Sequence, residues 1–346
     1  MSTNSNSAGQ KPFIIAEISG NHNGSLERGL EIVRAAAAAG ASAVKIQTYT
    51  ADTITLPVST SAFKVSEGHP LWGNKTLYEL YEEAHTPWEW HKPIFDLAKE
   101  LGMQAFSTPF DETAVDFLES LDVPLYKIAS LEIVDLPLIK QVAQTGKPMI
   151  LSVGTATIGE VAEAVEAARE GGCTDLTLLA CTSSYPAQAE DANLLRIPAL
   201  AEIFNVKVGL SDHTLGIGVS VAAVALGATV IEKHVTLRRA DGGVDSAFSL
   251  EPEELKALVD ECNAAHVARG SAHVWTTKAE TESLRLRPSL YVTKSVKAGD
   301  VITHENVRSV RPGGGLPPKE LPNVIGRTFA QDAELGTAVT WNLLNG

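Results

Sequence analysis

Short apolar runs alternate with helix-compatible segments from Phe13 onward. Buried parallel strands have this continuous apolar character, and the helices that connect them place apolar residues every three or four positions. Eight runs qualify, each followed by a segment that can form a helix: FIIAEI, AVKIQT, QAFSTP, LYKIAS, PMILSV, LTLLAC, VKVGLS and VIEKHVT. Eight such units predict an α/β fold, a closed (β/α)8 TIM barrel over residues 13–272 that follows a flexible tail at 1–12.

Helix boundary signals agree with this pattern. Ser25 precedes LERGLEIVRAAAAAG as a helix N-cap, Gly40 stands where a C-cap belongs, and DETAVDFLESL begins with acids that suit a helix N-terminus. The stretch from Tyr49 to His85, between the second strand and its helix, is longer than an ordinary connection. It could cover one end of a substrate pocket, or it could be a surface insertion packed by its own aromatic residues.

The pattern changes after EPEELKALVDECNAAHVARG. The next stretch, SAHVWTTKAETESLRLR, is polar and charged, which is typical of a linker, and we assign the linker to residues 273–286. Short β-type runs with Gly and Pro turns follow: SLYVTKSVKAGDVIT, NVRSVRPGGGLPP and NVIGRTFAQDAELGTAVT. They predict a second, small, β-rich domain over residues 287–346.

Charge and composition narrow the function classes. The chain carries 28 Lys and Arg against 42 Asp and Glu, a net charge of −14, which argues against a nucleic-acid partner because such partners need clustered cations. No stretch is apolar enough for a membrane helix, and the polar opening lacks a signal-peptide core. Cys173, Cys181 and Cys262 show no metal-ligand spacing and are expected to be reduced core thiols. We therefore expect a cytoplasmic protein with a small-molecule substrate.

Candidate chemistry lies where the predicted strands end, because the catalytic groups of TIM barrels sit at the C-terminal ends of the strands. Lysines and hydroxyls gathered at one mouth suit a ligand with phosphate and carboxylate groups. The alternative is that the strand lysines point outward and pair with acids on the helices. In chain order the polar residues are Glu17, Lys45, Gln47, Ser107, Thr108, Lys127, Ser130, Glu132, Ser152, Cys181, Ser183, Tyr185, Ser211, Asp212, His213, Glu232 and His234.

Two histidines end consecutive predicted strands. His213 follows the seventh strand and His234 ends the eighth, and neighbouring strands of a barrel could bring both imidazoles to one divalent ion. Histidines are also common as structural residues, and two of them leave other coordination positions to water, substrate or Glu17. In the loop ADGGVDS that follows, Asp245 could bond sugar hydroxyls or simply serve the turn.

Long ordered motifs carry a resemblance to a known family. At AEISGNHNG, VKIQT, FSTPFDETAVDFL, YKIAS, GLSDHTLG, EKHVT and RADGGVDSAFSLEP the chain resembles the N-acetylneuraminate and pseudaminate synthase family of sialic acid synthase type. The last sixty residues resemble that family's SAF, or antifreeze-like, domain. LYELYEEAHTPWEWHKPIF and CTSSYPAQAEDANL are more similar to the pseudaminate branch than to the neuraminate branch.

The resemblance implies a role for each matching residue. Lys45, Lys127, His213 and His234 would be catalytic, and the two histidines would bind a divalent metal, most readily Mn²⁺ with Mg²⁺ or Co²⁺ as alternatives. The resemblance implies that Glu17 lies near the metal, and our hypothesis is that Glu17 is catalytic as the group that orients or deprotonates a water there. It further implies a domain-swapped homodimer in which Arg311, or its neighbour Arg308, enters the site of the other copy. The residues implied for phosphoenolpyruvate are Lys45, Lys127, Ser130, Ser152, Ser183 and Ser211, and those for the sugar are Glu132, Tyr185 and Asp245.

The resemblance also implies a reaction. The expected activity is a transferase-type condensation of phosphoenolpyruvate with 2,4-diacetamido-2,4,6-trideoxy-L-altrose and water, which gives pseudaminic acid and phosphate. An N-acetylneuraminate or legionaminate synthase that uses an N-acetylmannosamine-type sugar is the alternative of the same chemistry. A Schiff-base aldolase that uses Lys127 or Lys45, and a non-catalytic sugar-binding protein, are alternatives of other classes. In the neuraminate branch Asn is usual at the position of Ser183.

Overall fold

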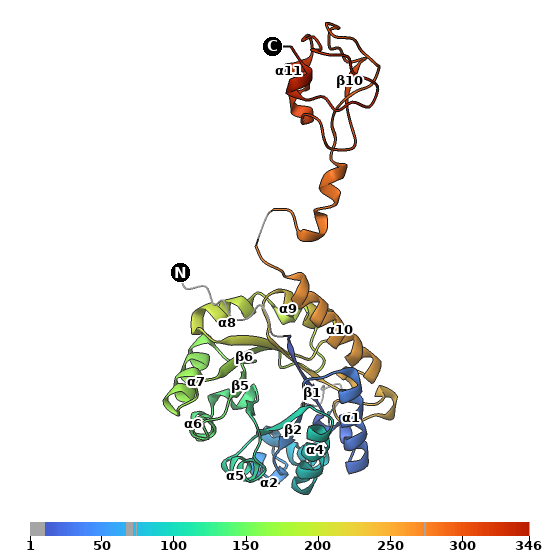
Figure 1. The fold of residues 1–346 in the computed structure, drawn as a ribbon. Helices are drawn as coiled ribbons and strands as arrows, with labels where there is room; N and C mark the ends of the chain where they lie inside the picture. Colours follow the sequence, from blue (N-terminus) through green and yellow to red (C-terminus); the bar gives the residue numbers. More distant parts are fainter. Residues whose placement is uncertain (1–10, 67–71, 74, 273–274, 346) are drawn as a thin grey trace. The chain divides into compact units, whose positions relative to one another are not determined.

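The computed structural model describes residues 11–66, 72–73, 75–272 and 275–345. Residues 1–10 of the predicted tail therefore lie outside the described residues. The chain divides into two compact units, one up to Gly270 and one from Ser271 onward (Figure 1). Among the described residues, no helix is both long enough and apolar enough to cross a membrane.

The larger unit is a closed barrel, as the sequence predicted. Each of its eight strands pairs in parallel with the next, and β8 pairs with β1 to close the ring. All eight runs picked from the apolar pattern form strands. The strands are β1 (Phe13–Glu17), β2 (Ala43–Thr48), β3 (Gln104–Pro109), β4 (Tyr126–Ile128), β5 (Met149–Ser152), β6 (Leu176–Cys181), β7 (Lys207–Asp212) and β8 (Val230–His234).

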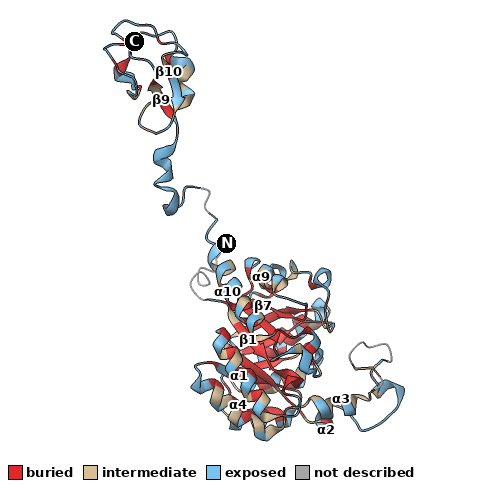
Figure 2. Cartoon of the chain, turned by 90° about the vertical axis from the view of Figure 1, so that its right-hand side faces the viewer, coloured by how far each residue is buried: buried red, intermediate tan, exposed pale blue. Residues whose placement is uncertain are grey.

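Helices surround the barrel, and the buried residues concentrate in its strands (Figures 1 and 2). Ser25 caps α1 by accepting a hydrogen bond from the Arg28 amide, and Gly40 ends that helix with a left-handed φ of 87°. Asp111 caps α5 through two backbone amides. The helices of this unit are α1 (Leu26–Ala39), α2 (Ala51–Ile54), α3 (Leu77–Ala84), α4 (Trp88–Glu100), α5 (Glu112–Ser120), α6 (Leu136–Gln144), α7 (Ile158–Glu170), α8 (Arg196–Phe204), α9 (Gly218–Ala225) and α10 (Pro252–Ala268).

The long insertion after β2 holds α2 and α3, and the crossover helix proper is α4. Residues 67–71 and 74 of the insertion lie outside the described residues. The Trp72 indole donates a hydrogen bond to the Val244 carbonyl at 2.8 Å, and its ring centroid lies 5.7 Å from that of Tyr185. The insertion therefore reaches the loops that follow β6 and β8.

The smaller unit has its own apolar core, which includes Leu290, Val292, Ile302 and Phe329. Its regular structure is an antiparallel pair, β9 (Ser289–Val292) and β10 (Val307–Val310), with the short helix α11 (Leu321–Val324). Further isolated bridges, such as that between Tyr291 and Ala338, extend the β-type pairing. The small β-rich domain predicted from the sequence is therefore confirmed.

Candidate active site

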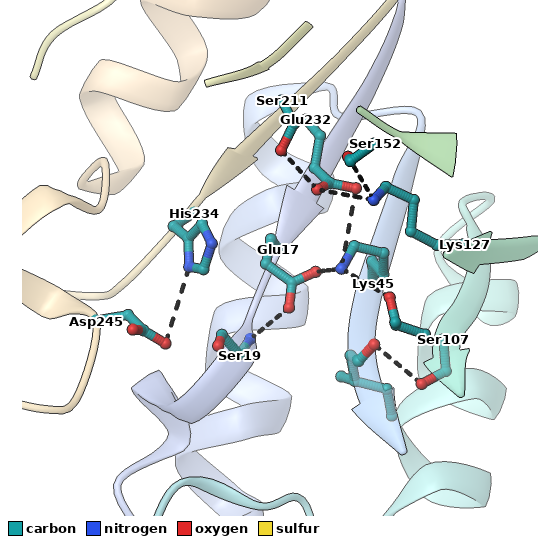
Figure 3. A network of polar contacts seen from close by, with 12 residues as sticks. Glu17, Ser19, Lys45, Ser107, Lys127, Ser152, Ser211, Glu232, His234 and Asp245 are labelled. Atoms are coloured by element: carbon teal, nitrogen blue, oxygen red, sulfur yellow. Dashed lines mark hydrogen bonds and ion pairs between the residues drawn. The ribbon is translucent and has the colours of Figure 1, made fainter. Parts of the chain in front are cut away.

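Four charged side chains meet inside the barrel. Lys45 of β2, Lys127 of β4, Glu17 of β1 and Glu232 of β8 are each at most 5% exposed. β2, β4 and β8 are not neighbours in the ring, so their side chains can meet only across its interior (Figure 3). The alternative of outward-pointing lysines that pair with helix acids is wrong for Lys45 and Lys127.

Each lysine bridges a carboxylate and a hydroxyl. Lys45 forms an ion pair with Glu17 and donates to the Thr108 hydroxyl at 3.2 Å. Lys127 donates to the Ser152 hydroxyl at 2.6 Å. Glu232 lies between them: its Oε2 is 3.9 Å from Lys45 Nζ, and its Oε1 is 3.9 Å from Lys127 Nζ.

Ser211 extends this array toward β7. Its hydroxyl donates to Glu232 Oε1 at 3.0 Å. The Ser19 amide donates to Glu17 Oε1 at 3.1 Å. Backbone and hydroxyl donors thus fix both carboxylates, as expected of a preorganised polar site.

Burial and charge set the protonation of this array. Burial raises the pKa of Glu17 to about 7, although the ammonium of Lys45 opposes the shift. Burial alone would raise the pKa of Glu232 too, but Lys127 and Lys45 outweigh it and lower that pKa. Burial lowers the pKa of Lys127. Perturbed groups of this kind are frequent at functional sites.

A second group of polar atoms surrounds Gly154, in the loop after β5. The Gly154 amide donates to the Ser130 hydroxyl at 3.2 Å. A Cβ at position 154 would stand only 2.5 Å from the Ser183 hydroxyl and 2.7 Å from that of Ser130. Two hydroxyls therefore converge on the space that the missing side chain leaves open. Cys181 Sγ lies 3.9 Å from Ser183 Oγ in the same group.

The two histidines face each other at the ends of β7 and β8. Their ring centroids are 5.3 Å apart. His213 Nδ1 lies 3.0 Å from the Thr182 carbonyl, an acceptor, so Nδ1 carries the proton and Nε2 keeps its lone pair. His234 Nδ1 is buried without a hydrogen-bond partner. Two imidazoles this close, one of them with an unpartnered ring nitrogen, fit a shared divalent ion.

The described residues contain no group of three or more His, Cys, Asp and Glu side chains arranged to hold a metal. The chain would therefore supply the two imidazoles, and water or substrate would fill the other positions. The donor set fits the predicted metal site.

Two of the residues predicted to contact the sugar, Asp245 and Tyr185, lie beside the histidines. Asp245 Oδ2 accepts from the Gly20 amide at 3.4 Å and lies 3.9 Å from His234 Nδ1. The Tyr185 ring lies 4.6 Å from that of His213. Glu132 has a buried oxygen without a hydrogen-bond partner, and burial raises its pKa to about 7.

The remaining predicted residues lie outside this centre or have a structural role. Arg311 and Arg308 belong to the smaller unit, where both are exposed. The Ser107 hydroxyl lies 2.6 Å from that of Thr48 and donates to the Ile46 carbonyl, so it joins β2 to β3. Gln47 is half-buried.

Glu232 is the residue whose importance the sequence understated. It appeared among the polar strand ends but received no role, although it contacts both lysines and Ser211. Its position two residues before His234 was the available signal, because residues i and i+2 of a strand share a face. Trp72 was also missed, since nothing in the local pattern tells where a long insertion docks.

Comparison with known proteins agrees with the resemblance found in the motifs. The NeuB family profile matches residues 32–274, and the SAF domain profile matches residues 287–345. The chain is 44% identical to the pseudaminic acid synthase of Campylobacter jejuni subsp. jejuni serotype O:23/36, over 95% of this chain and 96% of that one. It is 42% identical to the pseudaminic acid synthase of Helicobacter pylori, over 96% and 97%.

A solved structure gives the same result. The crystal structure of the N-acetylneuraminic acid (sialic acid) synthetase from Leptospira borgpetersenii serovar Hardjo-bovis, in complex with citrate, matches with a TM-score of 0.70 and 33% identity. The match covers 80% of this chain and 90% of that one. The chain thus has counterparts both in sequence and in fold.

Proposed function

The chain belongs to the NeuB family and carries a C-terminal SAF domain, and on that premise we propose that it is a pseudaminic acid synthase. In the proposed reaction, phosphoenolpyruvate, an altrose-type diacetamido sugar and water give pseudaminic acid and phosphate. The observation that carries the proposal is the buried array of two lysines and converging hydroxyls beside a pair of facing histidines. Near full-length identity of 44% to a relative named pseudaminic acid synthase supports the choice of sugar.

Phosphoenolpyruvate would bind at the lysines. Lys45 and Lys127 offset the charges of its phosphate and carboxylate, and Ser130, Ser152 and Ser183 offer hydroxyl donors close by. Charge-assisted hydrogen bonds in a buried site are stronger than those in water, so this part of the pocket orients the ligand as well as holding it. Glu232 keeps both ammonium groups in place before the ligand arrives.

The metal would be Mn²⁺, with Mg²⁺ or Co²⁺ as alternatives, held by His213 and His234, and when bound it supplies Lewis-acid polarisation of the sugar aldehyde. C3 of phosphoenolpyruvate attacks the aldehyde carbon, water adds at C2, and phosphate leaves. Glu17 is the proposed base that orients this water or takes its proton. A pKa of about 7 suits that task, because the carboxylate is then a usable base near neutral pH.

The sugar would lie between the histidines and the loops that cover them. Asp245 and Glu132 offer carboxylate oxygens to its hydroxyl and amide groups, and Tyr185 offers an aromatic face. Trp72 packs against Tyr185, so the insertion after β2 helps to shape this end of the pocket. This supports the pocket-covering alternative for the insertion.

We further propose a cytoplasmic, domain-swapped homodimer in which Arg311 of one copy completes the site of the other. An exposed arginine on the smaller unit is available for this role. Mixing an Arg311→Ala chain with a His213→Ala chain tests it, because the mixed dimer would regain one complete site. A monomeric mass in solution together with full activity would refute the swap.

The activity is tested by phosphate release from phosphoenolpyruvate with either 2,4-diacetamido-2,4,6-trideoxy-L-altrose or N-acetylmannosamine, each with Mn²⁺ and with EDTA. Metal-dependent release with the altrose-type sugar alone is expected. Release with N-acetylmannosamine instead would make the chain a synthase of the neuraminate or legionaminate type. No release with either sugar would refute the enzymatic proposal.

A further inference from the structure

A buried ion pair joins the two residues that precede the histidines in sequence. Asp212 ends β7 and Lys233 stands next to last in β8, and they are Cα partners in the register of the two strands. Their side chains are 1% and 0% exposed, and Lys233 Nζ lies 2.9 Å from Asp212 Oδ2. Each residue immediately precedes a histidine of the proposed metal site.

The inner and outer faces of these two strands carry different sets of polar contacts. Ser211 and Glu232 are also Cα partners, and their side chains point into the barrel, where they bond each other. Since neighbouring residues of a strand point to opposite faces, Asp212 and Lys233 lie on the outer face, toward the helices. The pair therefore does not touch the reacting groups, and it can influence where they lie through the backbone of the two strands.

The hydrogen bonds of Asp212 extend to both sides of His213. Its Oδ1 accepts from the amide and the hydroxyl of Thr214, at 2.9 and 2.8 Å. Its Oδ2 accepts from the Ser220 hydroxyl of α9 at 2.6 Å, as well as from Lys233. Lys233 in turn donates to the Thr214 carbonyl at 2.5 Å. The residues before and after His213 are thus tied to β8 and to α9.

We propose that Asp212 and Lys233 are positioning residues that fix the separation of His213 and His234, so that both imidazoles reach one divalent ion. This inference rests on the proposed function, because it needs the metal site. Stability alone is a weak reason for an ion pair at this buried position, because two apolar residues of similar size often stabilise a protein equally well. Support of ligands by groups that do not touch the metal is common, and its loss typically weakens metal binding about 10- to 100-fold.

The test is the double variant Asp212→Asn/Lys233→Met. Asn keeps an acceptor for Thr214 and a donor for Ser220, and Met fills the volume of Lys233 without a charge, so the cross-strand link is lost while packing stays. The control is Asp175→Asn/Lys207→Gln. It removes a 2.8 Å ion pair at the other end of β7, where both partners are exposed.

Mn²⁺ affinity is measured by calorimetry or electron paramagnetic resonance, without substrate, alongside the melting temperature and the binding of phosphoenolpyruvate in EDTA. We expect the Mn²⁺ Kd of the double variant to rise about 10- to 100-fold, with phosphoenolpyruvate binding unchanged and the control like the parent. An unchanged Mn²⁺ Kd in a folded double variant would overturn the positioning role alone. Equal loss of Mn²⁺ and phosphoenolpyruvate binding would also overturn it, since the pair would then serve the whole fold.

Two further results are decisive. If the parent chain binds no Mn²⁺, the metal site fails and the positioning role fails with it. If the double variant does not fold, Ser220→Ala takes its place, because it removes one bond to Asp212 from α9 without changing either strand. A weaker Mn²⁺ affinity in that variant supports the proposal, and an affinity equal to that of the parent overturns it.

Discussion

Replacing Gly154 with Ala tests the phosphoenolpyruvate site with a single methyl group. Gly154 has no positive φ, so Ala can adopt the same backbone conformation. Its Cβ would stand 2.5 Å from the Ser183 hydroxyl and 2.7 Å from the Ser130 hydroxyl, and the Cys181 sulfur would be 3.2 Å away. To reach 3.0 Å, the two oxygens would have to move by about 0.5 and 0.3 Å.

A serine avoids such a contact by rotating about χ1, which costs little because other staggered rotamers exist. The fold should therefore survive, but both hydroxyls would leave the place where they meet the ligand. A hydrogen bond to a charged group contributes about 1.5–3 kcal/mol. Loss of two weakens phosphoenolpyruvate binding by about 3–6 kcal/mol, which is roughly 10²- to 10⁴-fold in Kd.

The assay is calorimetric titration of phosphoenolpyruvate into the metal-free chain. Gly159→Ala in α7 is the matched control, because the nearest atom to its Cβ, a Thr157 oxygen, is 3.9 Å away. That control should bind like the parent and melt slightly higher, since Ala favours a helix over Gly. Parent-like affinity in Gly154→Ala, or an equal loss in the control, would refute the placement of the ligand at Ser130 and Ser183.

Three other predictions concern turnover, pH and metal. Glu17→Gln should abolish phosphate release and leave phosphoenolpyruvate binding intact, because an amide cannot take a proton from water. Retained turnover in the release assay would contradict the role of Glu17 as the base. Glu132 has a pKa raised to about 7 by burial, so it takes up a proton as pH falls through 7, and the KM for the sugar should rise there. Glu132→Gln should lose this pH dependence, and a profile that persists in the variant assigns it to another group. His213→Ala and His234→Ala should each reduce Mn²⁺ binding by an order of magnitude or more in calorimetry, as expected for lost ligands; tight binding in either variant argues against a shared ion.

The barrel was predictable because the apolar pattern along the strands is unambiguous. LTLLAC and AVKIQT are buried almost throughout, as expected of strands in a parallel sheet that is covered on both faces. The caps at Ser25 and Asp111 were predictable too, since they depend on residues within one turn of helix. Helix caps and the apolar pattern of a strand both depend on short stretches of sequence, so both can be predicted from them.

The pairing of charges was not predictable in the same way. No residue near Lys45 in sequence indicates that Glu232 is its partner. Glu232 is far along the chain, and its carboxylate lies 3.9 Å from Lys45 Nζ only because the ring of strands closes. The same holds for Gly154, whose neighbours Ser130 and Ser183 come from the ends of two other strands. Such contacts depend on register and closure, which the motifs imply only through a resemblance.

The ends of β7 and β8 show why the sequence alone does not tell whether a polar side chain points into the barrel or toward the helices. Ser211, Asp212, Glu232 and Lys233 are all polar and all buried, so alternation of apolar and polar residues is absent there. Direction is decided by the partner that each residue can reach: Glu232 finds two lysines across the interior, whereas Lys233 finds Asp212 beside it. A buried charge without such a partner would cost several kcal/mol, so the set of partners fixes the face of each residue. One pair of strands can thereby hold reactive groups inside and a neutralised ion pair outside, with a histidine directly after each member of the ion pair in sequence.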